Sequence, residues 1–222
     1  MARDWQEWHR GYDDPHSALS NRLTNVVAMI RQCLDTAAAG SIRVLSLCSG
    51  DARDMAAALA DHPRRADVVG CAVEMDPHLA AVATVNLESA GAAIEVRCAD
   101  AGDSRSFADA LPVDLLMLVG IFGNISDEDV HRMVTAVPRM AKPGATVIWT
   151  RHRRAPDLTP SIRRWFDEAG CECVDLVSPG TGGFAIGCER VGAATVRAFA
   201  EASVSGDLAA DARLFTFRDD AW

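Results

Sequence analysis

The chain of 222 residues is short of positive charge and of lysine. It carries 31 acidic against 22 basic residues, a formal net charge of −9, and Lys142 is its single lysine. A phosphate backbone or an anionic membrane surface attracts a basic surface, so this balance argues against both as partners. We therefore expect no nucleic acid and no membrane as partners.

Long apolar stretches are also missing. The longest runs, such as Val113 to Val119, are far shorter than a membrane-spanning helix requires. The first ten residues are charged and aromatic and lack the apolar stretch of a signal peptide. These features predict a cytoplasmic protein, which we expect to be a monomer or a homodimer.

The cysteines form no framework. There are seven, an odd number, and none of them forms a C-x-x-C pair. Several lie inside apolar, strand-like runs. We interpret them as reduced thiols and expect neither a disulfide scaffold nor a metal site.

What the sequence does contain is a regular alternation of short apolar runs and amphipathic stretches. The first five strand candidates are nearly continuously apolar, which is typical of parallel strands covered by helices on both faces. The predicted strands are Ile42–Leu47, Asp67–Val73, Ile94–Cys98, Val113–Val119, Ala145–Thr150, Cys173–Val177 and Phe184–Glu189. The predicted helices are Ala52–Ala60, His78–Ser89, Ser104–Ala110, Asp127–Met140 and Pro160–Ala169.

The last two strands are separated only by residues 178–183, too few for a crossover helix, so this pair should be antiparallel. Together these patterns predict an α/β fold with a doubly wound, mostly parallel, Rossmann-like sheet of seven strands. Its last strand is antiparallel, and helices precede the sheet.

Three segments follow from this pattern. Residues 1–40 would form an N-terminal helical lid or cap, residues 41–190 the core, and residues 191–222 a helical tail packed on the same domain. Trp5, Trp8 and Tyr12 would share one helix face, either to dock on the core or to close over a ligand. Within the tail, residues 214–217 suit a short final strand or a packed segment.

Ligands of open parallel sheets bind at the carboxyl ends of the strands. After the first strand, a small-residue turn with Gly50 would let a ligand approach the backbone, although any tight turn looks similar. After the second, Glu74 lies where a carboxylate could accept bonds from a ribose diol; the alternative, an acid before a helix, suits Asp76 better. After the third, Asp100 could meet an adenine amino group or cap residues 103–106.

In their order and spacing these features resemble the class I S-adenosylmethionine-dependent methyltransferases of the small-molecule type. The resemblance covers roughly Ile42 to Arg190 and includes the family's turn before its fifth strand, here Lys142-Pro143-Gly144-Ala145. It implies S-adenosyl-L-methionine as cofactor, with Glu74 at the ribose, and with residues 120–124 beside the transferable methyl group. The cofactor-binding residues that it implies are Ser46, Cys48, Ser49, Gly50, Asp51, Glu74, Met75, Asp100, Ala101 and Gly120.

The sequence departs from the family pattern in three places. Ser46 stands where the family has an acid, and Ala52 where it has a third glycine. The amino group of the cofactor would then have to find Asp51 or backbone carbonyls. Gly123 and Asn124 occupy the positions of a histidine pair found in many small-molecule members.

Methyl transfer from a sulfonium mainly requires alignment and the exclusion of water, and it needs a base only when the acceptor starts out protonated. The catalytic candidates are His152, Asn124 and Tyr12. His152 is the preferred base, although it also suits a surface position among arginines.

The acceptor would lie near the end of the fifth strand. Arg151 and Arg153 could bind an acidic acceptor there, or pair internally with Asp157, Asp167 or Glu168. Trp8 and Phe122 complete the predicted substrate contacts.

We therefore predict transfer of a methyl group to oxygen or nitrogen of a small molecule, with an acidic acceptor as one hypothesis. A non-catalytic protein that binds S-adenosylmethionine is the alternative from another class. A nucleic-acid methyltransferase is the alternative among enzymes, but it would need a basic face and an N-P-P-Y-like motif that residues 120–124 lack.

Overall fold

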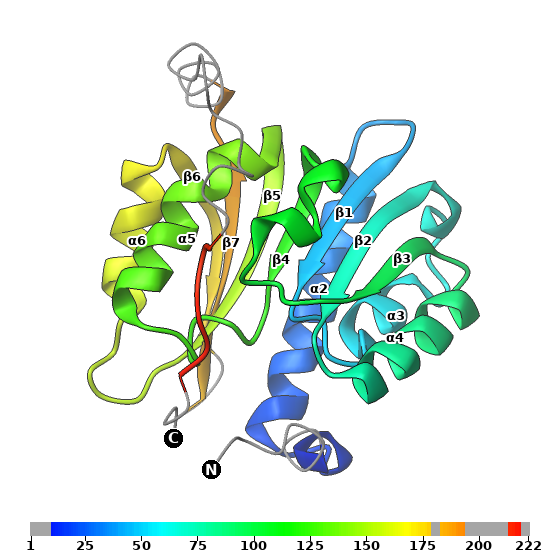
Figure 1. The fold of residues 1–222 in the computed structure, drawn as a ribbon, viewed down its shortest axis with the longest axis horizontal. Helices are drawn as coiled ribbons and strands as arrows, with labels where there is room; N and C mark the ends of the chain where they lie inside the picture. The colour runs from blue at the N-terminus through cyan, green and yellow to red at the C-terminus, as the bar shows by residue number, and fades with distance from the viewer. Residues whose placement is uncertain (1–9, 179–182, 194–212, 219–222) are drawn as a thin grey trace.

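The computed structural model describes residues 10–178, 183–193 and 213–218. Its centre is a seven-stranded sheet with the strand order β3-β2-β1-β4-β5-β7-β6 (Figure 1). The strands are β1 (Ile42–Leu47), β2 (Val68–Glu74), β3 (Ala93–Cys98), β4 (Val113–Leu118), β5 (Ala141–His152), β6 (Cys171–Val177) and β7 (Phe184–Val191). Neighbours from β3 to β5 pair in parallel, whereas β7 is antiparallel to both β5 and β6. The predicted mostly parallel sheet with a reversed last strand is confirmed.

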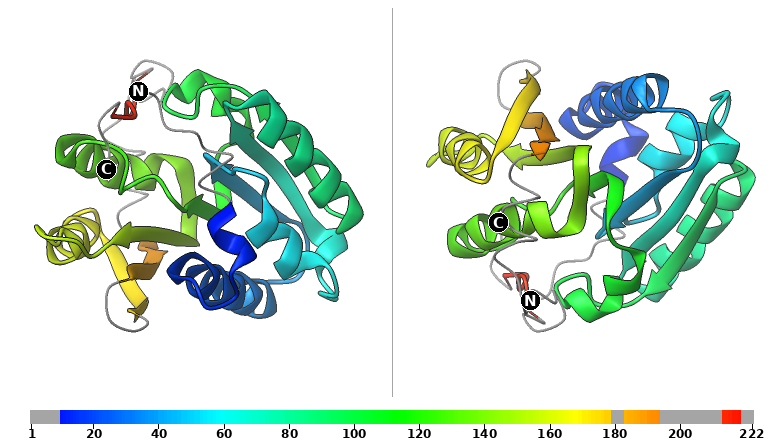
Figure 2. Two further views of the ribbon diagram at one scale, coloured as in Figure 1. Left: turned by 90° about the horizontal axis from the view of Figure 1, so that it is seen from below. Right: turned by 90° about the horizontal axis from the view of Figure 1, so that it is seen from above.

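Helices cover both faces of this sheet (Figure 2). The α-helices are α2 (Ala18–Thr36), α3 (Arg53–Leu59), α4 (Pro77–Ser89), α5 (Asp127–Met140) and α6 (Thr159–Glu168). Short 3-10 turns are η1 (Arg10–Asp13), η2 (Arg65–Asp67), η3 (Ser104–Ser106) and η4 (Ala108–Ala110). One core packs α2, α3 and α4 on the sheet, and the other packs α5 and α6. Strand β1 serves both, since Val44 belongs to the first core and Leu45 to the second, which explains its unbroken apolar run.

The helix predicted over Asp127–Met140 is confirmed as α5. The Ser126 hydroxyl accepts a hydrogen bond from the Asp129 amide at 3.0 Å, and three acids occupy the positive first turn. The helix ends at Met140, just before the predicted turn at Lys142. Strand β5, however, begins at Ala141 and reaches regular pairing only after a register shift in β4, so the turn lies within the start of the strand.

The predicted helix over residues 104–110 is wrong. The chain forms two 3-10 turns there, η3 and η4, separated by Phe107 with φ −146°. Phe107 is fully buried, and the Arg97 guanidinium donates a hydrogen bond to the carbonyl of Ser106 at 3.0 Å. Burial of the ring and capture of that carbonyl both compete with a continuous helix.

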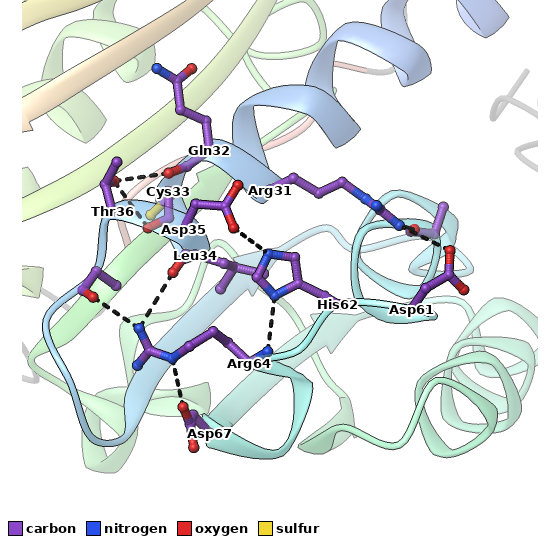
Figure 3. Close-up of polar contacts among 12 residues, drawn as sticks. Arg31, Gln32, Cys33, Leu34, Asp35, Thr36, Asp61, His62, Arg64 and Asp67 are labelled. Carbon is purple, nitrogen blue, oxygen red and sulfur yellow. Dashed lines mark hydrogen bonds and ion pairs between the residues drawn. The ribbon is translucent and has the colours of Figure 1, made fainter.

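At the amino ends of β1 and β2, Arg64 binds the chain that leaves α2 (Figure 3). Its Nη1 donates to the carbonyl of Ala37, and its Nη2 to the carbonyls of Ala38 and Gly40, each at 2.9 Å. Its Nε lies 2.6 Å from the Asp67 carboxylate. One side chain thereby satisfies three backbone carbonyls of the segment between α2 and β1.

Residues 213–218, which we call the C-terminal strap, cross the sheet region as a packed segment (red in Figure 1). They make two isolated bridges, Asp103 with Arg213 and Ile125 with Phe217. Leu214 and Phe215 are buried. Most of the predicted helical tail over residues 191–222 lies outside the described residues, as do Trp5 and Trp8. Within the described part of the chain, no helix is long and apolar enough to cross a membrane.

Candidate functional site

A cavity of about 290 Å³ lies at the carboxyl ends of β1, β2, β3 and β4. Its walls come from these four strand ends, from η1, α2, α3 and α4, and from the strap. The structure gathers in its lining the whole set of residues assigned to the cofactor by resemblance: Ser46, Cys48, Ser49, Gly50, Asp51, Glu74, Met75, Asp100, Ala101 and Gly120. Tyr12 also lines it.

The turn after β1 contains one glycine, but three of its residues have the positive φ that glycine adopts most easily. Cys48, Gly50 and Ala52 have φ values of +53°, +57° and +53°, although a left-handed backbone costs a non-glycine residue about 1 kcal/mol or more. Ala52, which stands in place of a third glycine, therefore has a left-handed backbone conformation in spite of its side chain. Next to them, the Ser49 hydroxyl is buried at the cavity without a hydrogen-bond partner.

Glu74 spans the gap between the first two strand ends. One carboxylate oxygen accepts the Gly50 amide at 2.8 Å, and the other accepts the Asp76 amide at 2.9 Å. Burial raises the pKa of Glu74. Asp76 itself caps α4 by accepting from the His78 amide at 2.8 Å, so the helix-cap alternative belongs to Asp76. Glu74 lines the cavity, and a carboxylate with about four acceptor positions can accept further bonds from a ligand there.

The two acids at the start of α3 differ in their partners. The buried Asp51 carboxylate is held by the Arg53 guanidinium at 2.5–3.0 Å, so the residue expected to meet an amino group is already paired. Asp54 also lines the cavity; its Oδ1 accepts the Met55 amide at 2.7 Å, and burial raises its pKa. Sequence reasoning missed Asp54, for which only its place in the first turn of α3 was a signal.

Tyr12 and Arg22 close the cavity from the N-terminal side. The Tyr12 hydroxyl accepts a hydrogen bond from Arg22, and the Arg53 guanidinium lies 4.3 Å from the centre of its ring. Burial raises the pKa of Tyr12, so its hydroxyl stays protonated at neutral pH. Arg22 is buried although α2 is amphipathic, and a basic residue one turn before the core residue Val26 was the signal that could have identified it.

Asp100 is attached to the strap. Its Oδ1 accepts the Gly102 amide at 2.8 Å, and its Oδ2 lies 2.6 Å from Nη1 of Arg213. The cap of η3 is Asp103, which accepts the Arg105 amide at 3.0 Å. The capping alternative for Asp100 is therefore wrong, and the carboxylate remains part of the cavity wall.

Acidic side chains outnumber basic ones in the lining. The carboxylates are those of Asp51, Asp54, Glu74, Asp76 and Asp100, and the guanidinium groups are those of Arg22 and Arg53. Such a lining favours a ligand that carries positive charge. In the described ranges, no group of three or more His, Cys, Asp or Glu side chains is placed to hold a metal ion.

The predicted substrate arginines lie outside this lining and are paired internally. Arg151 is buried, donates to the Phe122 carbonyl, and lies 3.8 Å from Asp127. Arg153 contacts Asp157 at 2.9 Å and the Ser178 hydroxyl at 2.8 Å. Both arginines therefore form ion pairs within the protein, which was the alternative interpretation. Arg153 pairs with Asp157, as expected, whereas Arg151 pairs with Asp127, which was not among the expected partners.

Three further candidates also lie outside the lining. The Phe122 ring is fully buried, 6.0 Å from the centre of Trp149, so its assignment to substrate is corrected to the core. Asn124 is buried and donates from Nδ2 to the Gly120 carbonyl at 2.6 Å, which shapes the loop after β4. Burial and the charges of Arg151 and Arg154 lower the pKa of His152 to about 4.

Comparison with known proteins gives structural likeness alone. No family model and no curated protein sequence matches the chain. The CurJ carbon methyltransferase superposes with a TM-score of 0.66 at 11% identity, covering 85% of this chain and 58% of that one. An O-methyltransferase family protein from Burkholderia thailandensis gives 0.57 at 15% identity, covering 85% and 69%. The [4+2]-cyclase SpnF gives 0.57 at 14% identity, covering 76% and 81%.

The topology and these likenesses agree. The chain has a sheet with β7 reversed and helices on both faces, and it superposes on methyltransferase structures at low sequence identity. The chain therefore has the fold of the class I S-adenosylmethionine-dependent methyltransferases.

Proposed function

We propose that the protein is an S-adenosylmethionine-dependent methyltransferase that acts on oxygen or nitrogen of a small molecule. The observation that carries this proposal is the cavity at the strand ends of a methyltransferase fold. Its lining contains every residue that the resemblance assigns to the cofactor.

The chemistry of the lining fits this cofactor. Glu74 offers an acceptor on each oxygen for the two ribose hydroxyls. Asp54, in the first turn of α3, supplies the carboxylate for the ammonium group that Ser46, near the end of β1, cannot supply. The buried Ser49 hydroxyl lacks a partner within the protein and suits a polar ligand atom. The excess of carboxylates complements a ligand with a sulfonium and an ammonium group.

The cofactor, when bound, supplies a methyl group activated by the positive sulfur. The chain then has to orient the acceptor and keep water out. Leu23, Val26 and Val119 give the cavity an apolar wall that excludes water. The Tyr12 hydroxyl, which accepts from Arg22 and stays protonated, belongs to a residue that lines the cavity and can contact an acceptor atom there. Because Arg151 and Arg153 are paired internally, the proposal does not depend on an acidic acceptor.

Calorimetric titration of the purified chain tests the proposal. S-adenosylmethionine and S-adenosylhomocysteine should bind at micromolar strength, and NAD, which shares the adenosine part, should not. Binding of NAD alone, or of none of the three, would contradict it. Transfer of a labelled methyl group to a panel of small alcohols, phenols and amines then tests the reaction itself.

A second candidate is a protein with this fold that uses the cavity for something other than methyl transfer. Two observations favour it: Ser46 replaces the family's acid, and SpnF, a [4+2]-cyclase by name, has a similar fold. Firm cofactor binding, together with no labelled product from any acceptor in the panel, would favour this candidate.

A further inference from the structure

The C-terminal strap connects two loops that line the cavity. At one end, the Leu214 amide donates to the Gly102 carbonyl at 2.8 Å, in the loop after β3. At the other end, the Arg218 amide donates to the Asn124 carbonyl at 2.9 Å, in the loop after β4. The buried side chains of Leu214 and Phe215 anchor the segment between these bonds.

Two strap residues reach the cavity or its wall. Phe217 lines the cavity, with its backbone bridged to Ile125 and its ring 5.7 Å from that of Phe215 in an edge-on contact. Arg213 pairs with Asp100, which lines the same cavity. The strap thus contributes an aromatic face directly and holds a carboxylate in place.

The strap packs closely against the backbone of Gly102. A Cβ at Gly102 would lie 2.3 Å from the Phe215 carbonyl oxygen and 2.9 Å from Nη1 of Arg213. Gly102 does not have a positive φ, so an alanine would fit its backbone conformation and clash only with its surroundings, chiefly the strap. This glycine is required by a segment more than 100 residues further along the chain.

We propose that Phe217 is a binding residue for the adenosyl end of the cofactor, held in position by the strap. This inference rests on the proposed function. Phe217 lines the same cavity as Asp100 and Ala101; its ring offers a face for a purine, and Asp100 offers an acceptor for the purine amino group. A base stacked on an aromatic side chain gains about tenfold or more in affinity.

The test compares Phe217→Ala with Thr216→Ala, because Thr216 is the exposed neighbour on the same strap and bonds to Asp129 through its backbone amide, which the substitution keeps. We expect Phe217→Ala to weaken S-adenosylhomocysteine about tenfold while the ligand-free protein stays folded, and Thr216→Ala to bind as the wild type does. Phe217→Tyr should restore affinity, since it keeps the aromatic face. 5′-Methylthioadenosine, which lacks the amino-acid end, should lose the same factor with Phe217→Ala.

Gly102→Ala provides a second route, because it displaces the strap and leaves Phe217 in the sequence. It should weaken binding by a similar factor. Wild-type affinity in Phe217→Ala, or a loss in Phe217→Tyr as large as in Phe217→Ala, would overturn the inference. A loss confined to S-adenosylhomocysteine would also overturn it. If the wild type binds neither adenosyl ligand, the proposed function fails first, and this inference with it.

Discussion

The two edges of the same sheet differ in how far the protein supplies hydrogen-bond partners for its buried polar groups. At the amino edge, all three guanidinium nitrogens of Arg64 donate to carbonyls or to a carboxylate, and Figure 3 shows the bond to the carboxylate of Asp67. His62 is buried beside them; its Nδ1 accepts the Arg64 amide, and its Nε2 lies 3.1 Å from Asp35. Because Nδ1 accepts, Nε2 carries the hydrogen that faces Asp35.

At the carboxyl edge, burial outweighs the backbone hydrogen bonds that Asp54 and Glu74 accept. It raises the pKa values of Asp54 and Glu74, and the Ser49 hydroxyl has no acceptor or donor in the protein. Cys48 and Ala52 have a left-handed backbone there. The comparison indicates that polar groups at the amino edge stabilise the fold, while those around the cavity cost stability and are available to a ligand.

The largest effect is expected at the amino edge. Arg64→Ala removes the bonds to the chain after α2 and should lower the free energy of unfolding by about 3 kcal/mol, measured by urea denaturation. Its exposed neighbour supplies the control: Arg65→Ala should change stability by less than about 0.5 kcal/mol. A fall in ligand affinity as large as the fall in stability would break the contrast between the edges.

The next effect belongs to the cavity. Glu74→Gln should weaken S-adenosylhomocysteine about thirtyfold, or about 2 kcal/mol, since a charged acceptor is lost at the ribose. Calorimetry measures the affinity. Glu88→Gln, an exposed change of the same charge on α4, is the matched control and should bind as the wild type does. Equal affinities in the two variants would remove Glu74 from the ligand site.

Asp54→Asn should stabilise the ligand-free protein at pH 7 by up to about 1 kcal/mol. A raised pKa means that the folded state disfavours the charged carboxylate, so the cost is full above the folded pKa and absent below the ordinary value of 3.8. Urea denaturation at several pH values should show the gain shrinking as the pH is lowered toward 3.8. A variant less stable than the wild type at pH 7 would contradict the comparison.

The smallest effect is expected at His152. Its pKa of about 4 and its position outside the lining predict that His152→Gln changes turnover by less than twofold. Between pH 6.5 and about 4 the unfolded state binds a proton at this histidine and the folded state does not, so His152 lowers the stability of the fold as the pH falls through that window. The variant should lose less stability there, and NMR titration of the ring reports the pKa directly. A tenfold fall in turnover would restore His152 as the base.

Much of the fold could be predicted because its signals are local. The apolar runs marked all seven strands, and Ser126 with the acids after it marked the start of α5. The exception was the stretch around Phe107, where burial of one ring and a bond from Arg97 overrode a helical pattern. Tertiary contacts decide such short segments, since a helix of seven residues has little stability of its own.

The candidate site was predictable where it follows strand ends. Gly50, Glu74 and Asp100 lie directly after predicted strands, and parallel strands bring such ends to one edge. Arg22 and Phe217 were missed because they reach the cavity from α2 and from the far end of the chain. The reverse error occurred at Phe122, which follows a strand yet turns into the core.

The sequence by itself determined the alternation of strands and helices, the reversed last strand and the acids at the strand ends. These features depend on periodicity and on connection length, which neighbouring residues specify. Only the tertiary structure decided that Arg151 pairs with Asp127, that Asp54 lines the cavity while Asp51 is held by Arg53, and that the strap ties Asp100 to Arg213. A charged side chain takes the partner that the folded chain brings within reach, and that choice has no periodic signature in the sequence.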